Sequence, residues 1–120
     1  MLIKLFRIVF FVGVVAVIVL SVIPQEAKPA TGLSGKMNHI MAYAALTVAG
    51  GMAYRGGWAL AILALGLVLM GASLELIQAF LPSRSASGYD ALANAVGMAL
   101  GSTVVLSAAF VLKRRRRIPG

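Results

Sequence analysis

Four apolar stretches, each of about 18 to 24 residues, occupy most of this 120-residue chain and limit what it can fold into. They cover about residues 5–23, 37–54, 58–81 and 89–112. An α-helix rises about 1.5 Å per residue, so each stretch is long enough to cross a hydrocarbon core of about 30 Å. Charged residues make up only 12% of the chain, against about a quarter in a soluble domain. We therefore predict an all-α, integral membrane four-helix bundle with four transmembrane helices, built as a single domain over residues 1–120.

The first apolar stretch could also belong to a cleavable signal peptide, because Lys4 and Arg7 precede or open it. However, it continues to Ile23, beyond the roughly 7–15 apolar residues of a signal peptide, and no small-x-small cleavage site follows. We expect an uncleaved first helix.

The segments between the stretches have the composition of loops. Residues 25–36 contain Pro29 and two glycines, residues 55–57 read Arg-Gly-Gly, and residues 82–88 are rich in serine. After the fourth stretch comes a basic tail over residues 113–120. The chain has no cysteine, which excludes disulfides and thiolate chemistry and leaves the redox compartment undetermined.

The basic residues predict the orientation of the helices. With both termini in the cytoplasm, eight of the eleven Lys and Arg residues lie on the cytoplasmic side, and only Lys28, Lys36 and Arg84 lie outside. The positive-inside rule favours this arrangement, which makes the chain a multi-pass protein of the cytoplasmic membrane. The basic residues that give the net charge of +8 thus set the orientation of the helices and contact membrane lipids. A nucleic-acid partner is not expected.

Polar side chains from three of the predicted helices fall at one depth, near the outer surface. The second helix enters there with His39 and Tyr43, the third carries Glu75 about 9 Å below its outer end, and the fourth begins with Asp90. Within each helix the polar and small residues recur at spacings of three or four, so they share one face. The candidate binding residues are Lys36, His39, Tyr43, Glu75, Gln78, Arg84, Asp90 and Asn94.

Glu75 needs a partner, because a charged side chain at the centre of a membrane span costs about 2.5–3.5 kcal/mol on insertion scales. Arg84 is the first candidate, since a guanidinium can hold a carboxylate bidentately, and Lys36 and His39 are alternatives. A single histidine and the absence of cysteine argue against a bound zinc ion, so no metal or cofactor is predicted.

Gly97 and Gly101 lie four residues apart in the fourth stretch. This small-xxx-small spacing predicts a groove through which two helices approach closely. The same face leaves a homodimer open as an alternative.

Several of these residues together resemble the signature of the VanZ-like family. The resemblance covers about residues 21–101 and rests on Ser21-x-x-Pro24, Lys36-x-x-His39-x-x-x-Tyr43, Glu75-x-x-Gln78, Phe80, Pro82, Arg84-Ser85, Asp90-x-x-x-Asn94, Gly97 and Gly101. It implies a small bacterial membrane protein with several spans, from a family named after a member associated with reduced susceptibility to the glycopeptide teicoplanin. One position departs from the pattern: Gly35 stands where the family usually has an aspartate, which weakens a catalytic interpretation and frees Lys36 to pair with Glu75.

Three functions remain open. The first is a binding protein of the cell envelope, whose outer polar site takes a lipid head group or a glycopeptide through Lys36 and Arg84. The second is a membrane enzyme acting on a lipid-linked phosphate or acyl group, with Glu75 or Asp90 as general base or magnesium ligand and His39 as acid. The third is a holin-like pore former, which the outer polar cluster disfavours.

Overall fold

The structure is a computed structural model that describes residues 1–118, and it contains four α-helices in sequence order. They are α1 (Leu2–Val22), α2 (Gly35–Ala53), α3 (Ala59–Ala79) and α4 (Gly88–Arg116), with a short 3-10 helix, η1 (Gln25–Ala27), in the first loop. The predicted all-α class is confirmed. Residues 119 and 120 of the predicted basic tail lie outside the described residues.

Three of the helices, α1, α3 and α4, are long and apolar enough to cross a membrane. The remaining helix, α2, is shorter and carries Lys36, Asn38 and His39 in its first turns. The structure thus supports a multi-pass membrane protein, in which α2 is less apolar than the potential spanning segments of α1, α3 and α4.

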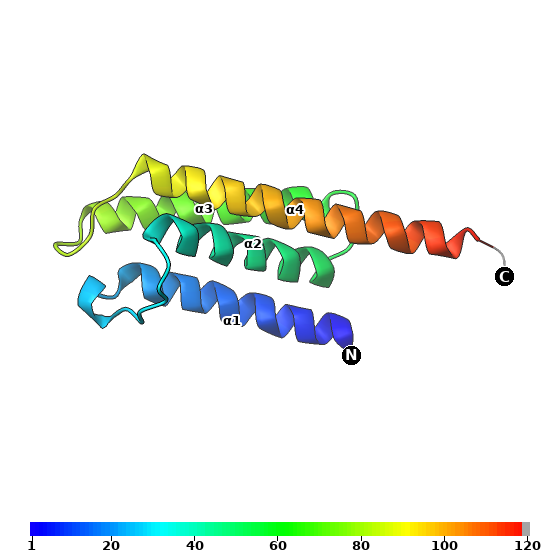
Figure 1. The fold of residues 1–120 in the computed structure, drawn as a ribbon, viewed down its shortest axis with the longest axis horizontal. Helices are drawn as coiled ribbons and strands as arrows, with labels where there is room; N and C mark the ends of the chain where they lie inside the picture. Colours follow the sequence, from blue (N-terminus) through cyan, green and yellow to red (C-terminus); the bar gives the residue numbers. More distant parts are fainter. Residues whose placement is uncertain (119–120) are drawn as a thin grey trace.

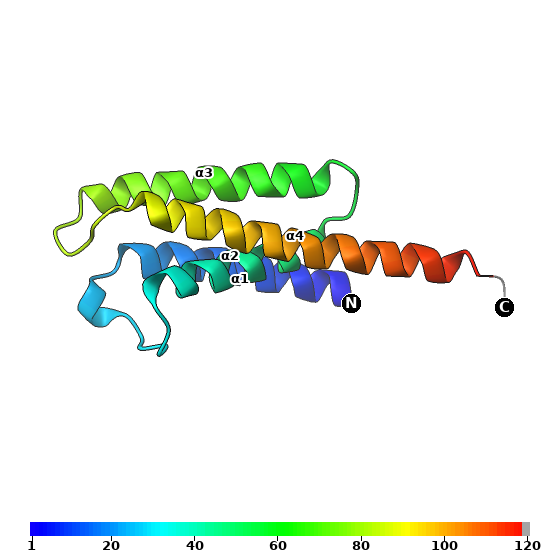
Figure 2. The same cartoon turned by 45° about the horizontal axis from the view of Figure 1, so that its top comes forward.

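The helices lie side by side along the long axis of a molecule that measures 61 × 26 × 24 Å (Figure 1). The chain runs up and down between two ends, so that the loops at residues 23–34 and 80–87 meet at one end, called here the polar end. The opposite end holds the N-terminus, the turn at residues 54–58 and the basic residues 113–117, and is called here the basic end (Figures 1 and 2). Consequently α2 and α4 run parallel to each other, and α4 extends furthest beyond the basic end.

Helix boundaries follow local capping chemistry. The Ser34 hydroxyl accepts a hydrogen bond from the Met37 amide at 3.2 Å, and the Ser87 hydroxyl accepts one from the Tyr89 amide at 3.3 Å, so these serines cap α2 and α4. At its other end α4 continues to Arg116, beyond the predicted limit of residue 112. Lysine and arginine are good helix formers, and their positive charges suit the C-terminal end of a helix dipole.

α2 packs against the other three helices and shares its largest interface with α4. A Cβ atom on Gly97 would collide with the Ile40 carbonyl oxygen, and one on Gly101 would lie 2.7 Å from the Ala44 carbonyl oxygen. The main chains of α2 and α4 are therefore in direct contact along this line. In this structure α2 itself covers both glycines.

α1 is packed quite differently, since Ser21 is its only buried residue. Large apolar side chains such as Ile8, Phe11, Val12 and Val15 are more than half exposed. A water-soluble protein rarely exposes an apolar surface of this extent, so α1 is suited to a lipid environment.

Candidate functional site

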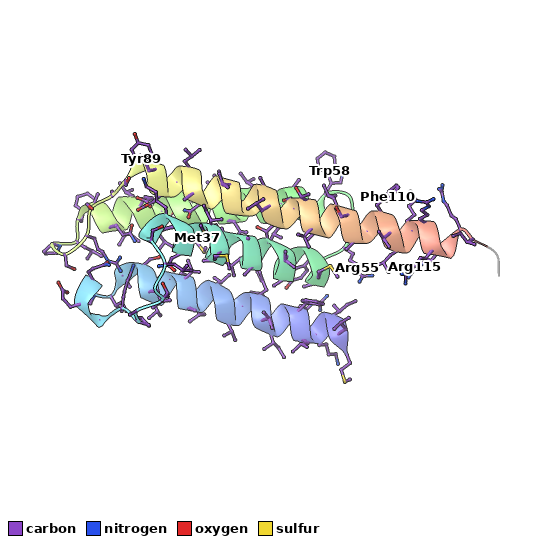
Figure 3. The ribbon with its side chains drawn as sticks, viewed as in Figure 1. Met37, Arg55, Trp58, Tyr89, Phe110 and Arg115 are labelled. Carbon is purple, nitrogen blue, oxygen red and sulfur yellow. The ribbon has the colours of Figure 1, made fainter. Side chains whose placement is uncertain are left out.

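The eight candidate residues all lie towards the polar end, but they differ in burial. Tyr43, Gln78 and Asn94 are buried, His39, Glu75, Arg84 and Asp90 are half-buried, and Lys36 is exposed. Figure 3 shows Met37 and Tyr89, the neighbours of this group on α2 and α4, at this end of the bundle. The structure places all eight candidates towards this end, as the helical spacing predicted, but only His39, Gln78, Arg84 and Asp90 line one cavity.

His39 joins α2 to α4. Its Nδ1 atom lies 2.8 Å from Asn94 Oδ1, and its Nε2 atom lies 3.8 Å from Asp90 Oδ2. Because the amide oxygen can only accept, Nδ1 is the donor in the first contact, which directs Nε2 towards the carboxylate. The second contact is an ion pair when the imidazole is protonated.

Tyr43 and Asn94 meet against Gly71 of α3. A Cβ atom on Gly71 would lie 3.1 Å from both the Tyr43 hydroxyl and Asn94 Nδ2. Gly71 therefore provides the space in which these two polar groups reach α3. This junction of three helices lies directly beneath His39.

Arg84 does not pair with Glu75, contrary to our expectation. Its Nη2 donates to the carbonyl oxygens of Leu20 at 2.6 Å and Ile23 at 2.8 Å, and its Nε also donates to Ile23 O at 3.2 Å. A further bond runs from Nη1 to Gln25 Oε1 at 3.1 Å. Arg84 therefore satisfies carbonyl groups at the C-terminal end of α1, where a positive charge is favoured by the helix dipole.

Glu75 and Lys36 have other partners as well. Glu75 Oε2 accepts a hydrogen bond from the backbone amide of Ser87 at 3.1 Å, so this carboxylate holds the loop that leads into α4. The Lys36 ammonium lies 4.8 Å from the centre of the Tyr89 ring, within the range of a cation–π contact. Neither side chain lines the cavity described below.

Gln78 reveals a contact that the sequence did not predict. Its Nε2 donates at 2.9 Å to the carbonyl oxygen of Ser21, and both residues are buried. Gln78 and Arg84 together attach the end of α1 to α3 and to the loop that follows it. The polar face of α3 was predicted, but the acceptor for Gln78 on α1 was not. That acceptor is the Ser21 carbonyl oxygen, and any residue type could supply it.

A cavity of about 320 Å³ opens at the polar end between these groups. Its charged and polar lining includes Gln25, Lys28, His39, Gln78, Arg84 and Asp90. A second cavity, of about 220 Å³, lies beside it between α1 and α2. Lys28 and His39 line both cavities, while Val17, Leu20 and Ala42 make the second one largely apolar.

Lys28 is the functional candidate that sequence reasoning missed. Burial, together with the positive charge of Arg84, lowers the pKa of Lys28 from 10.5, and Asp90 acts weakly in the opposite direction. Within residues 1–118 no carboxylate lies within 4.0 Å of its ammonium group. The available signal was its position as one of only three basic residues on the side predicted to lie outside the membrane.

The cavity is therefore suited to an anion. Lys28 and Arg84 bring two positive charges to its wall, against the single carboxylate of Asp90, which already faces His39. In the part of the chain that the structure describes, no three His, Asp or Glu side chains gather as a metal site would require.

Comparison of the chain with protein-family models, with curated proteins and with solved structures gave no match.

Proposed function

We propose that this chain is a VanZ-like protein of the bacterial cytoplasmic membrane, and that it binds the anionic head group of an envelope lipid or a glycopeptide in the cavity at the polar end. In this proposal all four helices cross the membrane and both termini are cytoplasmic. The family assignment rests on the motifs of residues 21–101.

The spanning role of α2 is supported by its length and its surroundings. It has 19 residues, and its polar side chains Thr47 and His39 face neighbouring helices or the cavity. A helix can carry polar groups through a membrane when other helices cover them.

The observation that carries the binding proposal is the excess of positive charge in the cavity. Lys28 is half-buried near Arg84, and among residues 1–118 no carboxylate lies within 4.0 Å of it, so an anion that enters the cavity relieves an unfavourable charge arrangement. The adjoining apolar cavity lined by Val17 and Leu20 offers a place for the hydrocarbon part of the same ligand. Together the two cavities suit a lipid phosphate.

The binding test uses purified protein in nanodiscs of neutral lipid, with a polyprenyl phosphate as probe and the matching polyprenol as its neutral counterpart. Lys28→Gln is expected to weaken binding of the phosphate about tenfold, because it removes the cation of the cavity for which residues 1–118 provide no ion-pair partner. Lys36→Gln is the matched control, since Lys36 carries the same charge at the same end but contacts Tyr89. Equal losses in both variants, or equal binding of the alcohol, would show that the cavity is not the site.

The orientation is tested separately with reporter fusions after Gly88 and at the C-terminus. We expect an external reporter at the first position and a cytoplasmic one at the second. An external C-terminus would turn the polar cavity towards the cytoplasm and contradict an envelope ligand.

A second candidate is favoured by the position of His39. This side chain lines the cavity and stands between Asn94 and Asp90, an arrangement in which an imidazole can transfer a proton to or from a bound ester. An enzyme of this kind would hydrolyse the ester of the bound lipid with water and release both the phosphate (or acid) and the alcohol over time, and His39→Gln would stop that release while the ligand still bound. A binding protein would show no release in either form.

A further inference from the structure

A groove separate from the polar cavity opens at the basic end, between α2, the turn at residues 54–58 and α4. Its volume is about 370 Å³. Its wall includes the apolar side chains Met52, Leu60, Val105, Ala109 and Leu112 and the basic side chains Arg55, Lys113 and Arg116. The groove thus combines a hydrocarbon surface with a cationic rim.

The basic tail of α4 contributes to this groove selectively. Lys113 and Arg116 are three residues apart and lie on the helix face that continues Val105 and Ala109, so both reach the groove. Arg114, Arg115 and Arg117 do not line it. In Figure 3, Arg55 beside the turn and Arg115 on α4 both lie at the basic end of the molecule.

The rim has no acidic side chain to balance its charge. The chain contains only three acidic residues, and Glu26, Glu75 and Asp90 all belong to the polar half, in the first loop, the last turns of α3 and the first turn of α4. Three cations around one apolar groove are complementary to an anion that carries hydrocarbon.

The groove lies where α4 passes from apolar to basic residues, a position that suits a lipid. Gly51 packs against Val105, and α2 ends at Ala53, whereas α4 continues to Arg116 (Figure 1). About nine residues of α4, or about 13 Å, therefore project beyond α2. This projecting part remains apolar through Leu112 and becomes basic only at Lys113, as expected where a helix passes from hydrocarbon to head groups.

We infer that this groove binds one anionic phospholipid from the leaflet that meets the basic end. Its phosphate lies between Arg55, Lys113 and Arg116, and one acyl chain lies along Val105 and Ala109. The lipid fills the space that α2 leaves beside the projecting end of α4.

The test measures retention of phosphatidylglycerol by the purified full-length chain in neutral detergent, using native mass spectrometry, with phosphatidylcholine of the same acyl chains as the neutral probe. The combined variant Arg55→Gln, Lys113→Gln, Arg116→Gln is expected to weaken retention of phosphatidylglycerol about tenfold or more. The combined variant Arg114→Gln, Arg115→Gln, Arg117→Gln removes the same charge outside the groove and is expected to weaken retention less than about threefold. Equal losses in the two variants would show attraction to the tail as a whole and overturn the proposal.

A second pair of variants fills space without changing charge. Ala109→Trp occupies the apolar part of the groove and is expected to weaken retention about tenfold, whereas Ala99→Trp, on an exposed part of α4 outside the groove, leaves retention as in the wild type. This pair decides the matter even if the triple groove variant does not fold. Unchanged retention in Ala109→Trp, or retention of phosphatidylcholine equal to that of phosphatidylglycerol, contradicts the proposed site.

Discussion

α1 and α2 are consecutive in the chain and similar in length, yet they are built in opposite ways. α1 has 21 residues, is almost wholly apolar and buries only Ser21. α2 has 19 residues, begins with Lys36, Asn38 and His39, and buries seven residues in contact with its neighbours. In water the more apolar helix would be the buried one. In this bundle the more polar helix, α2, is the buried one. Surrounding lipid favours an apolar exterior, and contacts between helices can satisfy the polar groups inside.

The comparison also separates two ways of attaching a helix. α2 is held by close main-chain contact with α4 along Gly97 and Gly101. α1 also packs along α2, but its C-terminal end is fastened by side-chain donors, Gln78 and Arg84, that reach its carbonyl groups. Four substitutions test this distinction, and they are given in order of decreasing effect.

Gly97→Val should have the largest effect. The added side chain meets the main chain of α2 at Ile40, which cannot move aside as a flexible side chain would. We expect the free energy of unfolding to fall by about 4 kcal/mol or more. Unfolding in mixed detergent provides the measurement. The matched control is Gly66→Val on α3, where a Cβ atom meets nothing within 4 Å, and a change of less than about 0.5 kcal/mol is expected there. Similar losses at both glycines would mean that helix propensity, not close packing, explains the effect.

Val12→Asp should come next. Val12 lies at the middle of α1 and is 62% exposed, so the new carboxylate would face hydrocarbon at a cost of about 2.5–3.5 kcal/mol. We expect a corresponding drop in the fraction of α1 that inserts, measured by a glycosylation-site insertion assay. Val12→Leu serves as the apolar control. If the aspartate variant inserted as well as the control, the exposed face of α1 would not be a lipid face.

Arg84→Gln should have an intermediate and localised effect. It removes the guanidinium donors from the carbonyls of Leu20 and Ile23, and we expect a loss of about 1.5–3 kcal/mol. Hydrogen exchange should accelerate at the end of α1 and remain unchanged in the middle of α2. Arg84→Lys keeps the charge but not the forked donor geometry, so it should restore only part of the protection. Acceleration spread evenly over both helices would contradict a local capping role.

Thr47→Val should have the smallest effect, although Thr47 is completely buried. Its hydroxyl donates at 2.7 Å to the Tyr43 carbonyl of the same helix, so an isosteric apolar replacement leaves no partner on another helix unsatisfied. We expect a change of less than about 1 kcal/mol in the free energy of unfolding. Thr47→Ala, which also removes the methyl group packed near Gly101, should cost more than the valine variant. A larger loss in the valine variant would indicate that the hydroxyl holds α2 to another helix.

Hydropathy alone predicted the all-α class and the approximate position of every helix, because an apolar stretch of about 20 residues between loops forms an α-helix in lipid. Two helix boundaries differ from the predicted ones because charge and capping determine them. α4 continues through its basic residues to Arg116, and α2 begins at Gly35 because Ser34 caps it. The composition predicted four membrane spans, whereas the structure supports three by length and hydropathy, α1, α3 and α4, because α2 carries several polar residues in its first turns.

The level at which the candidate residues lie within the bundle was predicted, but their pairings were not. Helical spacing brought His39, Asn94 and Asp90 to one level, and they are in contact. The predicted pairing of Arg84 with Glu75 was wrong, because the competing acceptors are backbone carbonyls at the end of α1, and no residue type marks them. Lys28 was missed for a related reason: its place in the cavity depends on how the loop at residues 23–34 folds back over α1.

The link from Arg84 to α1 also has a consequence for the order of assembly. The carbonyl groups that it binds belong to residues synthesised 61 to 64 positions earlier. During translation α1 is therefore complete before the residue that fastens its C-terminal end, and two further helices are made in between. The strongly apolar surface of α1 allows the helix to remain stable in lipid by itself until the helices that pack against it have been made.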